Sequence, residues 1–440
     1  MKKLISSISP VTLVIFVTLV MPPPVPAQLA DASSTTLGLS GNNTATVRGL
    51  AAIAVNPAGL AMSGSGFSLA LFPVQVRSDL HPIGLSDLKD VQRTVIPSAT
   101  REDWLARVTA EGTQTGSFGI DISEFAFTTG NIGFQVSTLM VGTFSLPPGA
   151  IEGLLYGNAG RTGSASSLDL SNALLQSYAI STVGLSIGIP IPISSTDLAV
   201  GVTAKYSIGH DILVSRSASS SIQNDPVRAT LNFPIIQTAD GYIGDLISSE
   251  LAWKFPRSNG DGIGVDVGFM LEHRRLSLGA SVENIFNTFS WDESKLIYRP
   301  GTALFEIGQS NSDFTEAPYV SAPANLRALI DNMAFEPSLR VGAALDLTRD
   351  FTVSGDLHTQ FGDRGASLSP KFHLGLGTEF RGMRVLYLRG GAAVITDGIQ
   401  YGGGASLVLG PVNISAAGAF RTGTMNEQVL GQVTLSFGGH

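Results

Sequence analysis

The sequence predicts an all-β protein: a transmembrane antiparallel β-barrel of about fourteen strands with an N-terminal plug and short helices in its outer loops. Three observations predict this fold class. Only 14% of the residues are charged and 50 are glycine, a composition typical of membrane proteins. Beyond the N-terminus, no uninterrupted apolar stretch reaches the roughly eighteen residues that a spanning helix needs. Short segments in which apolar and polar residues alternate recur along the chain, as in barrel strands.

The first 27 residues predict a cleaved secretory signal peptide. Lys2 and Lys3 precede an uncharged apolar run, 11–21, that is too short to span a bilayer. Small or aliphatic residues at 25–27 stand where a signal peptidase reads, so we expect cleavage before Gln28. The chain has no cysteine, which excludes a lipid-modified cysteine, disulfides and thiolate metal sites. An exported membrane protein without spanning helices must close into a barrel, so we expect it in the outer membrane of a Gram-negative-type cell.

The clearest predicted strand is 198–209, in which every second residue is apolar and the residues between them are small or polar. Because successive side chains of a strand point to opposite faces, one face would contact lipid and the other the lumen. Lys205 lies on the lumen face, and the same alternation in later segments places Asp266, Arg340 and Asp346 there. The strands predicted in this way lie near 64–75, 117–129, 131–146, 177–190, 197–215, 261–272, 275–286, 337–348, 350–361, 370–381, 384–395, 398–409, 411–422 and 427–437.

The lengths of the connections between these strands alternate, as in bacterial barrels with short periplasmic turns and long outer loops. Tight turns are predicted at 131, 190–197, 272–274, 349, 381–382 and 410–411. Long segments are predicted at 76–116, 147–176, 216–260 and 287–336, with shorter outer connections afterwards. This order places both chain ends in the periplasm. Helical periodicity predicts short helices near 85–91, 102–108, 168–175 and 325–333, which either cap the barrel mouth or capture a ligand.

The segment between the expected cleavage site and the first strand predicts a plug. An empty barrel of about fourteen strands would have a lumen wide enough to leak, and this segment is well placed to fill it. The alternative is a flexible periplasmic tail, which the apolar run Leu50–Val55 disfavours. The expected organisation is a signal peptide at 1–27, a plug at 28–63 and a barrel at 64–440.

Within the predicted plug, Asn56-Pro57-Ala58-Gly59-Leu60 follows a run of small and aliphatic residues and shortly precedes the first strand. This segment resembles the Asn-Pro-Ala motif in the N-terminal hatch of FadL-type outer-membrane transporters for long-chain fatty acids and other hydrophobic compounds. Related barrels, including that of the type IX secretion attachment complex, begin similarly. The resemblance implies that these five residues are hatch elements. We expect a turn at 56–58 near the first strand.

Polar residues on the lumen face are the other candidate site residues. The set is Lys205, Asp266, Arg340, Asp346, Asp356, His358, Lys371, His373 and Glu379. Ser354, Asp356 and His358 share one strand face, so the residue types of a serine hydrolase are present. No motif of fixed spacing accompanies them, and pairing among such charges would simply stiffen the wall. The histidines are scattered without the spacing of a metal site. We therefore predict no enzyme activity, no cofactor and no metal.

The predicted function is passive uptake of hydrophobic small molecules, such as long-chain fatty acids, through an outer-membrane channel. The alternative is a non-transporting outer-membrane barrel that serves secretion, surface attachment or protein binding. The expected partners are outer-membrane lipid, a hydrophobic small-molecule ligand and the barrel-assembly machinery. The net charge of −8 and the lack of a basic stripe argue against nucleic acid as a partner.

Overall fold

The computed structural model describes residues 29–64, 66–91, 95–163, 167–193, 195–224, 226–239, 258–331, 333, 336–362, 370–396, 398–423 and 427–438. The expected signal peptide and Gln28 lie outside the described residues.

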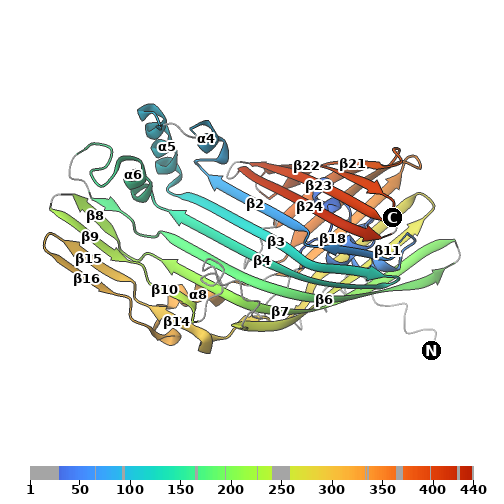
Figure 1. Ribbon diagram of the computed structural model, residues 1–440, viewed down its shortest axis with the longest axis horizontal. Coiled ribbons are helices and arrows are strands. Elements are labelled where there is room, and N and C mark those ends of the chain that lie inside the picture. The colour runs from blue at the N-terminus through green and yellow to red at the C-terminus, as the bar shows by residue number, and fades with distance from the viewer. Residues whose placement is uncertain are drawn as a thin grey trace, which may run out of the picture.

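The main body is a closed antiparallel β-barrel of 14 spanning strands, which confirms the predicted fold class (Figure 1). The first spanning strand consists of two pieces, β1 (Ser68–Leu71) and β2 (Val74–His81), and both pair with the last strand to close the barrel. The others are β3 (Gln114–Thr129), β4 (Ile132–Leu146), β6 (Leu174–Ile193), β7 (Thr196–Arg216), β11 (Gly260–His273), β12 (Leu276–Asn287), β18 (Ser338–Asp346), β19 (Phe351–Gln360), β20 (Phe372–Phe380), β21 (Leu386–Ile395), β22 (Gly398–Leu409), β23 (Val412–Gly423) and β24 (Glu427–Gly438).

Apolar side chains cover the outside of this wall. Val202, Ile263, Phe269 and Val433 are exposed, while the strand residues between them face inward. This alternation is what a strand needs when one face meets lipid and the other meets a polar lumen. In the part of the chain that the structure describes, none of the helices has the length and apolarity to cross a bilayer, a result that does not bear on strands.

The barrel has two different ends. Short turns such as 130–131, 274–275 and 410–411 join strands at one end, which we call the turn end, and longer segments emerge at the other, the loop end. The wall is also uneven, because β6 and β7 have 20 and 21 residues whereas β18 and β20 have 9 each. In Figure 1 the long strands therefore extend well past the short red and orange ones at the loop end.

Two strand boundaries differ from the sequence prediction. The first strand reaches His81 instead of ending near 75, with an interruption where Phe72 has a φ of 54°. The turn predicted at 190–197 lies within that range but is shorter, because β6 and β7 stay paired up to Ile193 and Thr196. Pro190 and Pro192 lie beyond the last residue of β6 that pairs with β4. The edge of β6 that faces β4 therefore makes no ladder hydrogen bond there, and the missing amide hydrogen of proline costs none.

The outer loops contain the expected short helices α4 (Leu85–Asp90), α5 (Ser98–Glu111) and α8 (Ala324–Asp331), together with α6 (Pro148–Tyr156), which the sequence reading missed. The helix predicted at 168–175 is wrong. Asp169 accepts a hydrogen bond from the Ser171 amide and Asn172 has a φ of 67°, so the chain turns there and enters β6. A second, five-stranded sheet of loop residues was also not foreseen; it consists of β5 (Leu168–Asp169), β8 (Ser221–Asn224), β9 (Val227–Asn232), β15 (Thr302–Glu306) and β16 (Gln309–Asp313).

Residues 29–62 lie inside the barrel, where Figure 1 shows them in blue behind the red strands. They form α2 (Ser34–Gly38), α3 (Leu50–Val55) and the 3-10 helix η1 (Pro57–Ala61), joined by turns. Three of the barrel's buried apolar clusters contain residues of this segment, and Ala52, Ile53, Ala58 and Leu60 have no exposed surface. We call residues 29–62 the plug.

Candidate functional site

The Asn-Pro-Ala-Gly-Leu segment has a specific structural role in the plug. Asn56 has an extended backbone that ends α3, and its side-chain Oδ1 accepts a hydrogen bond from the Ala58 amide and so caps η1. Its Nδ2 donates to the carbonyls of Thr44 in the plug and Phe269 in β11. Pro57 occupies the first position of η1, where no amide hydrogen is required. One side chain thereby joins two parts of the plug and the barrel wall.

The position of this segment differs from the sequence expectation. The 3-10 helix η1 packs against β6, β7 and β11, rather than forming a turn beside the first strand. The reason is that β6, β7 and β11 carry glycine on the inner face at the positions that η1 contacts. An added Cβ at Gly201 of β7 would come within 2.2 Å of the Ala58 amide nitrogen, and one at Gly188 of β6 within 2.7 Å of the Ala61 nitrogen. The glycines leave the room that η1 fills.

Glycines continue this close fit on other strands of the wall. A Cβ at Gly279 would lie 2.4 Å from the Thr44 carbonyl oxygen, and one at Gly391 would lie 2.3 Å from the Leu39 carbonyl oxygen. Backbone can approach backbone this closely only where the wall residue has no side chain. The plug is therefore held within a ring of inward glycines from several strands.

The plug separates two cavities in the lumen. The cavity on the loop-end side, which we call the inner chamber, has a volume of about 190 Å³, and its lining includes Lys205, Asp266, Arg340, His358 and His373. The cavity on the turn-end side has a volume of about 440 Å³, and its lining includes Asp346 and Glu379. Plug residues line both cavities.

The charges of the inner chamber are arranged in pairs. Lys205 Nζ lies 2.5 Å from Asp266 Oδ1 and donates to Asn284 Oδ1 at 2.6 Å. Arg340 Nε lies 2.7 Å from Glu283 Oε1. Removing one partner of such a buried pair would leave an uncompensated charge, so each pair acts as a unit. The strands that carry these pairs are adjacent, and the pairs tie β7 to β11 and β12 to β18.

On the chamber wall, β19 and β20 bring Asp356, His358 and His373 together. The two imidazole rings stack with centroids 4.3 Å apart and planes 8° apart. His358 Nε2 lies 3.3 Å from Asp356 Oδ2, and the same oxygen accepts a hydrogen bond of 2.8 Å from the Thr44 amide of the plug. His373 Nε2 contacts Asn42 Oδ1 at 3.0 Å. These polar residues of the wall therefore contact the plug directly.

The remaining predicted lumen residues lie elsewhere. Glu379 pairs with Arg389 and Arg381 near the turn end, and Asp346 accepts a hydrogen bond from Thr352 there. Lys371 precedes β20, is exposed and lines neither cavity described above.

Catalytic or metal chemistry finds little support in this geometry. Ser354 donates its hydroxyl hydrogen bond to the Asn42 carbonyl, so it serves plug attachment and does not face His358 as a nucleophile would. Across the described ranges, no group of three or more histidine, cysteine, aspartate or glutamate side chains is arranged to hold a metal ion.

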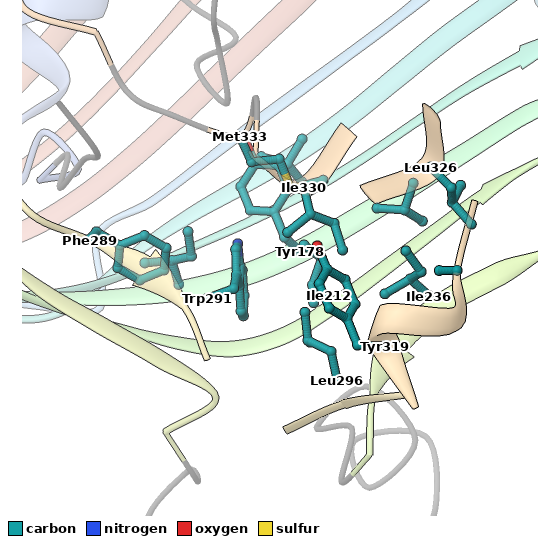
Figure 2. Packing of buried hydrophobic residues seen from close by; sticks show 14 of the residues in the cluster. Tyr178, Ile212, Ile236, Phe289, Trp291, Leu296, Tyr319, Leu326, Ile330 and Met333 are labelled. Carbon is teal, nitrogen blue, oxygen red and sulfur yellow. The ribbon is translucent and has the colours of Figure 1, made fainter. Parts of the chain in front are cut away.

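An apolar cluster lies inside the wall at the loop end (Figure 2). We call it the outer apolar cluster; its buried members are Leu139, Val141, Tyr178, Ile180, Ile212, Val214, Ile236, Phe289, Trp291, Leu296, Tyr319, Ala322, Leu326, Ile330 and Met333. The first six are on the inner faces of β4, β6 and β7, and the others belong to loop segments and α8 that fold over them. Leu139 also lines the inner chamber, so the cluster and the chamber adjoin.

Within this cluster, Phe289 and Trp291 meet edge to face at 5.5 Å. Trp291 is 7% exposed, and among the described residues its indole nitrogen has no hydrogen-bond partner. An apolar surface inside a barrel is unusual because lumen residues are generally polar. This cluster was not predicted from the sequence, because its members come from segments far apart in the chain. The signal was present in β7, where the regular alternation breaks at His210 and Asp211 and both Ile212 and Val214 then face inward.

Asn42 and Glu283 are two further site residues that were not predicted from the sequence. Neither stands in a recognisable motif, and each acquires its role only through partners that are distant in the sequence.

No protein-family model matches the chain, and no curated protein matches it. Solved structures do share its fold. The Ralstonia pickettii toluene transporter TbuX aligns with a TM-score of 0.52 and 13% identity over 93% of this chain and 98% of that one. A deltaS2S3 mutant of the TodX monoaromatic hydrocarbon channel aligns with a TM-score of 0.50 and 11% identity over 93% of this chain and 99% of that one. The resemblance to FadL-type barrels is thereby confirmed for the fold.

Proposed function

We propose that the protein is a passive outer-membrane channel for hydrophobic small molecules, such as monoaromatic hydrocarbons or long-chain fatty acids, with the plug as its gate. The observation that carries this proposal is the outer apolar cluster. It places buried aliphatic and aromatic side chains inside the wall at the loop end, next to a chamber that leads to the plug. Small apolar ligands bind in such apolar surroundings with few polar groups. The solved channels of the same fold, named for toluene and monoaromatic hydrocarbons, support this assignment.

The order of the zones gives a direction of passage. A molecule entering at the loop end meets the apolar cluster, then the charged inner chamber, then the plug and the second cavity. Short turns are periplasmic in bacterial barrels, so the direction is inward. No step in this route requires bond making, and we propose no enzyme activity. The expected signal peptide would deliver the chain to this membrane.

A reversible lock of the plug tests the proposal. An added Cβ at Gly38 of the plug would lie 3.4 Å from Arg389 Cβ in β21, close to the usual disulfide separation of about 3.5–4.5 Å. The chain has no cysteine of its own, so Gly38→Cys with Arg389→Cys creates a single pair. Uptake of labelled toluene and of a labelled long-chain fatty acid is measured with the pair oxidised and then reduced. We expect oxidation to abolish uptake of the permeant and reduction to restore it.

The two single-cysteine variants are the matched controls, because each changes one side chain without joining plug and wall. Arg389→Cys also removes the ion pair with Glu379, so its uptake sets the reference for the locked protein. If cells with and without the gene take up both compounds equally, the channel assignment is overturned and a barrel for secretion, attachment or protein binding is favoured. If uptake persists unchanged with the lock closed, the plug is not the gate.

A further inference from the structure

We propose that His358, His373, Asp356 and Asn42 form a proton-sensitive latch that docks the plug on the barrel wall, and that acidification of the medium releases it. That release of the plug opens the channel to uptake rests on the proposed function. The docking itself is a property of the fold and is measured separately below.

The latch lies where the plug meets the short side of the barrel. The plug makes a tight turn at Ser40 and Gly41, which have φ values of 53° and 89°. An added Cβ at Gly41 would lie 3.2 Å from His373 Cε1 and 3.4 Å from His358 Cε1. The stacked imidazoles are therefore in van der Waals contact with the turn and form the surface on which it rests.

Hydrogen bonds fix the next plug residues to the same place. Asn42 is completely buried, donates from Nδ2 to the carbonyls of Leu376 and Ala392, and contacts His373 Nε2 through Oδ1. Since Oδ1 of an amide can only accept, His373 is the donor in that bond. The Thr44 amide donates to Asp356 Oδ2. The latch thus joins the plug to β19, β20 and β21 through bonds to backbone carbonyls, one imidazole and one carboxylate, and the second imidazole contacts the turn at Gly41.

Most of the charged groups around the rings are positive. Arg340 of β18 and Arg421 of β23 would repel a proton on His373 from other strands of the wall, and Asp356 of β19 is the negative group nearby. The plug residues in contact, Gly41 and Asn42, are uncharged, and Arg340 is already paired with Glu283 of β12. Two protonated rings at a 4.3 Å separation would repel each other with only one carboxylate to offset them.

Each added proton weakens a contact with the plug. A proton on His358 strengthens its bond to Asp356 Oδ2, the same oxygen that accepts from the Thr44 amide, so the two donors compete. A proton on His373 then places like charges in stacked rings, which must separate and break the bond to Asn42. Histidine rings that are freed from the docked plug change charge between about pH 5 and pH 8, so protonation favours the released state in the range that an external medium covers.

Protons can reach the latch without unfolding. Both His358 and His373 line the inner chamber, which lies on the loop-end side of the plug. The medium would therefore act on the latch directly, without passage through a lipid phase.

The experiment measures plug docking through a single thiol. Ala45 is completely buried in the docked plug, and the chain has no other cysteine, so Ala45→Cys reacts with a maleimide only when the plug leaves the wall. Labelling rates are compared at about pH 7.5 and about pH 5.5, a range that spans histidine titration. Thiolate is lost on acidification, which slows labelling, so a faster rate in acid reports exposure.

We expect acid to accelerate labelling of Ala45→Cys several-fold, since release linked to one proton changes by up to about tenfold per pH unit. His373→Gln in the same background keeps an amide donor for Asn42 but cannot be protonated, and should lose the acceleration. His358→Gln removes the ring pair while leaving the bond between His373 and Asn42, and should also lose it. The matched control is His210→Gln, because His210 is a lumen histidine that contacts Ser181 and should keep the acceleration.

Equal acceleration in all three glutamine variants, or none in the parent, would overturn the latch. If a glutamine variant is undocked at both pH values, amide hydrogen exchange of residues 40–46 is measured in the unsubstituted chain instead. Exchange in acid that follows only the change in the intrinsic rate would show that the plug stays docked, and would also overturn the latch. Uptake of the labelled compounds is followed in parallel. A plug that undocks in acid without any uptake at either pH leaves the latch standing and contradicts the channel assignment instead.

Discussion

At the scale of single residues, the plug is held by side chains that bond to backbone and by wall residues that have no side chain. Asn56 joins Thr44, Phe269 and Ala58 with one amide group. Inward glycines then allow the plug backbone to lie directly on the wall. These two kinds of contact explain why a segment with few large side chains can still be buried. Its contacts depend on the close approach of plug backbone to wall backbone and on hydrogen bonds, and not on large side chains.

Gly279 offers the sharpest test of this fit. Valine there would place Cβ 2.4 Å from the Thr44 carbonyl oxygen and 2.8 Å from Ala45 Cα, both backbone atoms that cannot rotate away. We expect Gly279→Val to displace the plug, at a cost of about 1–3 kcal/mol typical of overpacking, and to raise conductance in planar bilayers. The barrel should remain folded, as judged by its heat-modifiable mobility in detergent gels.

Gly431→Val is the matched control for that substitution. Gly431 lies in β24 with no atom within 4 Å of an added Cβ, so valine there should leave the plug docked and the conductance unchanged. Equal conductance in the two variants would show that the inward glycines do not set the position of the plug.

At the scale of elements, the strands could be predicted from sequence and much of the rest could not. The alternation around Lys205, Asp266 and Arg340 is a local property of each strand and can be seen in the sequence. It fixes the register, because a slip of one residue would expose these charges to lipid. The predicted turn at 190–197 is too long because proline is tolerated where β6 has a neighbour on one side only. The small loop sheet depends on pairing between segments far apart, such as β9 with β15, which no local pattern reveals.

The candidate site was predictable to a similar extent. Alternation is sufficient to identify His358 and His373 as neighbours on one face, but not to show that they stack beneath the plug. Their partner Asn42 is 331 residues away from His373 in the sequence. The outer apolar cluster combines three strands with a distant loop, so only the fold brings it together.

The outer helices provide a pH prediction that is independent of the barrel. Asp87 in α4 accepts hydrogen bonds from both terminal nitrogens of Arg107 in α5 and from the Gly84 amide. Partial burial opposes ionisation, but the bonds from Arg107 and Gly84 together outweigh it and lower the pKa of Asp87. Because the pKa is lower in the folded loop than in the unfolded one, this carboxylate stabilises the loop above its ordinary pKa of 3.8, and the stabilisation is lost as the pH falls through the lowered value.

We therefore expect hydrogen exchange of 85–111 to accelerate as the pH falls below about 3.8, after correction for the intrinsic rate, while the barrel strands stay protected. Asp87→Asn should exchange faster at neutral pH and lose this acid response. Exchange in the asparagine variant that still follows the parent pH profile would assign the response to another group.

At the scale of the whole molecule, the wall and the plug are separable in stability but joined in function. Every spanning strand is paired on both sides, so the barrel satisfies its backbone groups without help from the plug. The plug, in contrast, depends on the wall for the burial of Ile53, Ala58 and Leu60. The charged pairs, which tie strand to strand, belong to the wall.

Deletion of residues 30–55, with the signal peptide and the expected cleavage site kept, tests this division. It removes α2 and α3 and with them the separation between the two cavities, which have volumes of about 190 Å³ and 440 Å³. We expect a folded barrel whose conductance in planar bilayers exceeds that of the intact chain, because a lumen of about fourteen strands without its plug is wide enough for water and ions. Gly279→Val should lie between the two, since it displaces the plug without removing it. A deletion variant with unchanged conductance and unchanged hydrophobic uptake would mean that residues 30–55 do not close the lumen, and the gated channel would lose its main structural support.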